Sequence, residues 1–285
     1  MKIKKNATQL LALTASAVCL TSALHGATLF SDSFSSDSLS SYTINSTGTA
    51  GVTYGATAGV GGGGGLLIAN SGNPSTSIIP GAATNNTGFT IDLGAAKTVT
   101  MSMMLKYSGS LSGTTQGFLG FSNGQDYNFG SNTVGATSAV GGAVIAGINL
   151  VTRGGTNGGV GNGGTGAPNA TLTSGNWYLY QVELTKPLSG SNSWTFNGSL
   201  QDFGSNGLVA GAVATSYTGA TNAFGTTADT GINAAATQTF LNFGVRNQMW
   251  TAADNLSVTT IPEPSAFALI GFGLLGLATT RRRTS

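Results

Sequence analysis

Carboxylates are the main residues of this 285-residue chain that could do chemistry, because cysteine and histidine are almost absent. Cys19 is the sole cysteine and His25 the sole histidine, and both precede residues 28–260, the body of the chain. The body therefore has no Cys/His zinc site, no disulfide framework, no Ser-His-Asp or Cys-His catalytic set and no histidine pH switch. Acidic residues, amides and aromatic rings remain as candidates.

A pair of carboxylates would indicate glycoside hydrolysis, since a retaining enzyme needs an acid and a nucleophile about 5 Å apart. The body contains a single glutamate, Glu183, with Val182 and Leu184 beside it. The nearest acid in the sequence, Asp202, follows 19 positions later. This spacing gives no catalytic pair, so we expect no enzymatic activity. A glycan-active hydrolase is the alternative.

Oxygen ligands for a hard cation are the next candidates. Ca²⁺ binds Asp, Asn and backbone oxygens. Asp32, Asp254 and Asn255 would converge on such an ion if the first and last strands of the body are neighbours. The alternative is that Asp32 caps a turn, while Asp254 and Asn255 begin the last strand through side-chain-to-backbone hydrogen bonds. No other cofactor is expected.

Three tryptophans are candidates for stacking on sugar rings, with Asn and Asp side chains reading the sugar hydroxyls. Trp177 and Trp194 lie in strand-like runs and are expected in the core, where aromatic rings are common. Trp250 lies in the loop-like stretch "NQMWTAADN". We therefore expect Trp250 to be exposed and to contact a glycan.

The elements that must position these residues are short strands. "VTMSMMLKY" (99–107) and "NWYLYQVELT" (176–185) have the length and alternation of strands. In the second run, one face carries Tyr178, Tyr180, Val182 and Leu184, and the other carries Gln181 and Glu183. "SWTFNGSLQDF", "TFLNFGVR" and "DNLSVT" behave alike. Many short strands between turn residues predict an all-β fold, a single β-sandwich of jelly-roll type.

The glycine content and the net charge further limit the kinds of site that the body can contain. Glycine accounts for 45 residues, and the runs Gly61–Gly65 and Gly154–Gly166 are expected to be loops. A phosphate-cradling loop would need a lysine and a following helix, which neither run has. Residues 28–260 hold five basic and eight acidic residues, a net charge of −3. Without a basic patch to neutralise phosphates, nucleic-acid binding is not expected.

The N-terminus, "MKIKKNATQLLALTASAVCLTSALHGA", has the order of a secretory signal peptide. Lys2, Lys4 and Lys5 form the charged region, an apolar stretch follows over residues 10–20, and small residues come next. We predict a signal helix over residues 1–27. An uncleaved anchor helix is the alternative.

The C-terminus combines three features. Pro262, Glu263 and Pro264 precede an apolar run, and an arginine cluster closes the chain at Arg281, Arg282 and Arg283. We predict that this apolar run, residues 265–280, forms a transmembrane helix. The helix would be about 24 Å long, which is short compared with the ~30 Å hydrocarbon core. The arginines would stay on the cytoplasmic side. This order closely resembles the PEP-CTERM sorting signal of Gram-negative bacteria.

The resemblance implies a membrane-anchored precursor that is exported across the inner membrane and contacts that membrane transiently. It implies recognition by an exosortase-type membrane protease, which removes the tail. Delivery to the cell surface or extracellular matrix would follow. Proteins with this signal typically accompany exopolysaccharide and biofilm production.

A second resemblance concerns the body, which starts with "LFSDSF", ends with "ADNLSVT" and has a Trp-led strand between them. It is similar to the concanavalin-A-like and laminin-G-like jelly rolls of bacterial surfaces. We thus divide the chain into a signal peptide (1–27), a β-sandwich (28–260) and a sorting signal (261–285). The expected function is that of an exported, non-enzymatic surface or matrix protein that contacts polysaccharide.

Overall fold

The computed structural model describes residues 27–46, 51–69, 75–80, 98–109, 116–122, 139–146, 149–156, 172–185, 194–221, 240–246 and 250–261. Within these ranges the chain forms two antiparallel sheets and two short 3-10 turns, η1 (Leu39–Ser41) and η2 (Val60–Gly62). The all-β prediction is confirmed.

Sheet A has eight strands: β1 (Ala27–Asp32), β3 (Gly51–Gly55), β4 (Gly65–Ala69), β6 (Thr98–Tyr107), β10 (Trp177–Thr185), β11 (Trp194–Asp202), β12 (Val213–Thr221) and β14 (Trp250–Ile261). Their order is β12-β11-β10-β6-β14-β4-β3, and β1 also pairs with β14. The first and last described strands are therefore neighbours.

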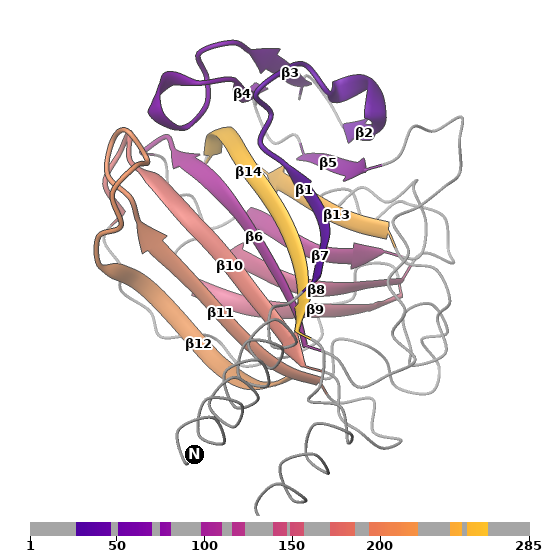
Figure 1. Cartoon of the computed structure of the whole chain (residues 1–285). Helices are drawn as coiled ribbons and strands as arrows, with labels where there is room; N and C mark the ends of the chain where they lie inside the picture. The colour runs from indigo at the N-terminus through magenta and orange to yellow at the C-terminus, as the bar shows by residue number, and fades with distance from the viewer. Residues whose placement is uncertain are drawn as a thin grey trace, which may run out of the picture.

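Sheet B has six strands: β2 (Tyr42–Ser46), β5 (Ser75–Pro80), β7 (Gln116–Ser122), β8 (Ala139–Ala146), β9 (Asn149–Thr156) and β13 (Phe240–Arg246). Their order is β2-β5-β13-β7-β8-β9. In Figure 1 the strands of sheet A lie in front of β7, β8 and β9, so the two sheets form the layers of a sandwich.

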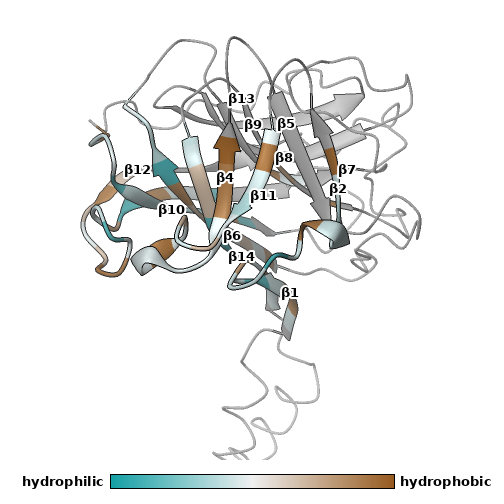
Figure 2. Cartoon of the chain, turned by 90° about the horizontal axis from the view of Figure 1, so that it is seen from above, coloured by the Kyte–Doolittle hydropathy of each residue, from teal (hydrophilic) through white to brown (hydrophobic). Residues whose placement is uncertain are grey.

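The main core lies between the sheets because alternate side chains of each strand point inward. In β6, Met101, Met103 and Leu105 are fully buried, and their neighbours in sequence at Thr100 and Ser102 are partly exposed. The other sheet A strands and sheet B add Tyr180, Val182, Leu200, Val258, Leu119, Leu241 and Phe243. Strand β4, brown along its length in Figure 2, contributes Leu66 and Ile68.

A small second core covers one end of the outer face of sheet A. Met104, Trp177 and Ala252 are buried there, under Val60 and Phe203 from two loops. Trp177 is thus buried as predicted, although it packs outside the sandwich rather than inside it. The side chain of Trp194 lies outside the described residues.

The strand predictions are confirmed for β6, β10, β11, β13 and the second half of β14. Residues 61–64 of the first glycine run form a turn, in which Gly61 and Gly62 adopt positive φ angles of 65° and 80°, and Gly65 begins β4. The prediction that Gly154–Gly166 is entirely loop is wrong at its start, because β9 extends to Thr156 and pairs with β8.

The predicted transmembrane helix lies outside the described residues, and so does the signal helix apart from Ala27, which begins β1. Ile261, the first residue of the predicted sorting signal, ends β14. Within the described residues, no helix has the length and hydropathy needed to cross a membrane.

Tyr180 provides a test of the core. Its ring is fully buried, and its hydroxyl has no hydrogen-bond partner in the described part of the chain. We expect Tyr180→Phe to leave the free energy of unfolding unchanged or to raise it by about 1 kcal/mol, because an unsatisfied buried hydroxyl is costly. Urea denaturation would measure this.

Tyr178→Phe is the matched control, since the Tyr178 hydroxyl accepts a 2.7 Å hydrogen bond from the Thr173 amide. This variant should lose about 0.5–1.5 kcal/mol. A larger loss for Tyr180→Phe than for Tyr178→Phe would contradict the assignment.

Candidate functional site

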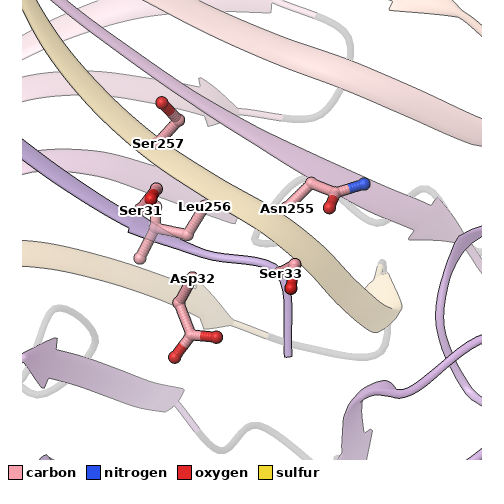
Figure 3. A pocket seen from close by; sticks show the side chains of 6 residues that line it. All are labelled: Ser31, Asp32, Ser33, Asn255, Leu256 and Ser257. Carbon is pink, nitrogen blue, oxygen red and sulfur yellow. The ribbon is translucent and has the colours of Figure 1, made fainter. Parts of the chain in front are cut away.

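The pairing of β1 with β14 brings the predicted cation ligands onto adjacent strands. Asp32 pairs with Leu256, and Leu256 directly follows Asp254 and Asn255 in the sequence. A hollow of about 340 Å³ lies at this point, lined by Ser31, Asp32, Ser33, Asn255, Leu256 and Ser257 (Figure 3).

Asp32 caps the turn that follows β1. Its Oδ1 accepts a 2.7 Å hydrogen bond from the Phe34 amide. Its Oδ2 accepts hydrogen bonds from the Ser38 hydroxyl at 2.7 Å and the Tyr42 hydroxyl at 2.6 Å. Burial and this carboxylate raise the pKa of Tyr42, so the phenol remains a donor. Both carboxylate oxygens of Asp32 are thus used to fix the turn against β2.

Asp254 ties a distant loop to the last strand. Asp254 is buried, with 3% of its surface exposed. Its Oδ2 accepts a 2.8 Å hydrogen bond from the Val60 amide, and its Oδ1 accepts a 2.7 Å hydrogen bond from the Asn255 amide. A Cβ at Gly59 would lie 2.6 Å from Asp254 Oδ2 and would collide with the Gly64 carbonyl oxygen. Only glycine therefore lets the loop approach this carboxylate.

Burial raises the pKa of Asp254 above its ordinary value of 3.8, and the charge of Asp32 adds to the shift. The hydrogen bonds from Val60 and Asn255 act in the opposite direction and lower the pKa. Desolvation is the largest of these effects, because a carboxylate removed from water loses hydration that two amides only partly replace.

Asn255 has a left-handed backbone, with φ of 52°, at a bulge where β14 has an extra residue relative to β6. Its side chain is exposed, and in Figure 3 its amide and the Asp32 carboxylate point in different directions. Among the described residues, no group of three or more His, Cys, Asp or Glu side chains could hold a metal ion.

The structure thus brings Asp32, Asp254 and Asn255 near one another without aiming them at one point. The turn-capping alternative is confirmed for Asp32. Asp254 uses side-chain-to-backbone bonds as expected, but in the interior of β14 rather than at its start. Sequence reasoning missed the serines of the hollow; "SDS" at residues 31–33 was the available signal.

The prediction that Trp250 is exposed is wrong. Trp250 is the first residue of β14, is fully buried, and packs edge-on against Tyr107 and Tyr178 with ring centroids 6.0 and 6.4 Å apart. The two tyrosine rings cover Trp250, although the sequence around it resembles a loop. It is unavailable for stacking on a sugar.

Glu183 and Asp202 do not form a carboxylate pair. Glu183 is opposite Asn197, whose Nδ2 donates a 2.9 Å hydrogen bond to it, and Asp202 is opposite Tyr178. These two positions are five residue steps apart along β10, about 16 Å at ~3.3 Å per residue. Glycosidases need about 5–9.5 Å. Asp202 instead binds the Asn176 side chain and the Gly204 amide.

Asp254 should impose a pH dependence on stability. Because its folded pKa is raised, its contribution is fully present below about 3.8 and is lost as pH rises through the folded pKa. In Asp254→Asn this slope should disappear. The variant should also be less stable overall, since an amide nitrogen would replace one acceptor and face a backbone N–H.

The measurement is urea denaturation of the wild type and Asp254→Asn at several values between pH 4 and pH 7. The stability advantage of the wild type should shrink as pH rises. Asp37→Asn, at an exposed position, is the control. An advantage that grows with pH would show that hydrogen bonding outweighs burial at Asp254.

Calcium removal tests the cation prediction. The oxygens of Asp32 and Asp254 already accept hydrogen bonds from the protein. We therefore expect the same Tm in excess chelator and in millimolar calcium. A calcium-dependent rise in Tm that is lost in Asp32→Asn and kept in Asp37→Asn would instead establish a calcium site.

The sorting residues Pro262, Glu263, Pro264, Arg281, Arg282 and Arg283 lie outside the described residues. A family model for the PEP-CTERM protein-sorting motif matches residues 260–283, which confirms the resemblance. Such a motif indicates an exported precursor that is anchored in the membrane before it is sorted to the surface. No curated protein matches the chain.

Solved structures resemble the sandwich. The basic winged bean lectin, solved with the Tn antigen, is 12% identical, with 83% of this chain and 98% of that chain covered and a TM-score of 0.50. Lectin II from Ulex europaeus is 11% identical (82% and 98% covered, TM-score 0.46). An endo-1,3-beta-glucanase from Streptomyces sioyaensis is 15% identical (83% and 96% covered, TM-score 0.44). At these identities the likeness concerns the fold alone: the chain carries a PEP-CTERM sorting motif at residues 260–283, behind a β-sandwich that resembles the folds of these solved structures.

Proposed function

We propose that this protein is an exported, non-enzymatic component of the cell surface or extracellular matrix, where it associates with polysaccharide. The observation that carries the proposal is the PEP-CTERM motif at residues 260–283, directly behind a lectin-like sandwich. The motif would direct the protein to the cell surface. The sandwich would be the folded domain that is delivered there.

The route to the surface is supported by where the strands begin and end. Ala27, the first residue of β1, is paired with Thr260, and Ile261 ends β14 opposite Thr98. The chain therefore enters and leaves the body side by side at one end of sheet A. Two membrane-directed segments can then hold one end of the sandwich toward the membrane.

An exosortase-type protease in the inner membrane would remove the tail. Since the matched motif starts at the last residues of β14, a cut at or beyond Pro262 leaves every described strand pair intact. The sorted product would be a complete sandwich released from its anchor.

The non-enzymatic part of the proposal rests on the carboxylates. In the described residues Asp32, Asp202 and Asp254 are engaged by backbone amides, and Glu183 by an asparagine. Side chains used in this way stabilise turns and loops. Association with exopolysaccharide, as in biofilms, needs binding rather than bond cleavage.

The test begins with the protein from its native host. Intact mass and cell fractionation should give a mature form that ends near Pro262–Pro264 and lies outside the inner membrane. That material should be slowed in gels that contain the host's exopolysaccharide and should release no reducing sugar from it. Retention of Arg281–Arg283 in the membrane fraction would contradict sorting. Release of sugar would favour a glycan-active hydrolase instead.

A further inference from the structure

The outer face of sheet A carries two rows of small polar side chains that cross the strands. In the first row Thr28, Thr259, Thr100, Glu183 and Asn197 are successive partners on β1, β14, β6, β10 and β11. In the second row Ser31, Ser257, Ser102, Gln181, Ser199 and Ser216 are successive partners from β1 to β12. All of these residues are partly or fully exposed. We call them the Thr row and the Ser row.

The rows form a regular lattice because sheet geometry fixes the spacing. Neighbouring strands lie about 4.8 Å apart, so the Ser row extends about 24 Å across six strands. Alternate residues of one strand share a face, which puts the two rows about 6.6 Å apart. The regularity is invisible along the chain, because each strand contributes one residue to each row.

The hollow beside Asp32 lies at one end of the Ser row. Ser31 and Ser257, the first two members of that row, line it together with the exposed Ser33 and Asn255. The Ser row therefore ends in a recess at its β1 edge (Figure 3).

The chemistry of the rows limits the partner. Glu183 is the one charged member, and Asn197 donates a hydrogen bond to it. Phosphates, acidic polymers and anionic membranes need cations that the rows do not have. A stable interface with a second copy needs an apolar centre, and neither row has an apolar member. Hydroxyls and amides can both donate and accept hydrogen bonds, as sugar hydroxyls do.

We propose that the Thr and Ser rows form a docking surface for an uncharged, extended polysaccharide, with the hollow at Ser31 and Ser257 as its recess. This inference rests on the proposed function and adds to it the surface and the class of polymer. Many weak hydrogen bonds along one chain would provide the affinity.

The experiment compares the full-length gene product with two double variants. Ser102→Lys with Ser199→Lys puts cations on both sides of Gln181, within the Ser row. Ser36→Lys with Ser205→Lys adds the same charge at exposed positions outside both rows. Mobility is measured in gels that contain dextran, a linear β-1,3-glucan or soluble cellulose as neutral polymers, and alginate as the charged one.

The wild type and the control variant should be slowed by at least one neutral polymer and not by alginate. The row variant should bind the neutral polymer at least about tenfold more weakly. A row variant that binds as tightly as the wild type overturns the docking surface and leaves the proposed function standing. A wild type that is slowed by alginate and by none of the neutral polymers also overturns it. A wild type that binds no polysaccharide contradicts the proposed function itself.

Sedimentation of the same three proteins provides the check on self-association. All three should give the same oligomeric state, with the row variant folded by circular dichroism. If the row variant alone dissociates into smaller species, the surface joins copies of this chain and the polysaccharide assignment is wrong.

Discussion

The sandwich depends on one extra residue in β14. Between Asp254 and Ser257 this strand advances three positions while β6 advances two, and Asn255 takes up the difference with a left-handed backbone. Without that residue, every side chain beyond it would change face. The bulge keeps Leu256 and Val258 in the core and leaves Ser257 outside. It also divides the other edge of β14, so that β4 pairs before it and β1 pairs after it.

The bulge also begins a chain of contacts that holds the loops at one end of sheet A. Asp254, just before it, accepts a hydrogen bond from Val60, and the neighbouring Gly61 amide donates one of 2.7 Å to the Asn206 carbonyl. The loop that contains Asn206 in turn bonds to both backbone groups of Trp177, through Gly204 and Phe203. The buried carboxylate thus adds a polar link to the small apolar core at this end, and burial of its charge is the cost.

The same bulge explains how far the sequence could predict the structure. Period-two alternation in β10 separated its two faces correctly, because β10 pairs with β6 without a register shift. Around Trp250 the register shifts twice, between Trp250 and Ala252 and again at Asn255, so a buried strand resembled a loop. Turn capping by Asp32 was the alternative to a cation site, because aspartate commonly bonds to the backbone of its own turn. The link from Asp254 to Val60 spans 194 residues, and nothing local indicates it.

Register also decides how the proposed docking surface would bind a neutral polymer. Each hydrogen bond exchanged between water and a sugar hydroxyl contributes only about 0.5–1.5 kcal/mol. Binding through such weak, repeated contacts requires many of them at once on a rigid support. Antiparallel pairing across β1, β14, β6, β10, β11 and β12 provides that support, because the same register that buries the core also aligns the serines.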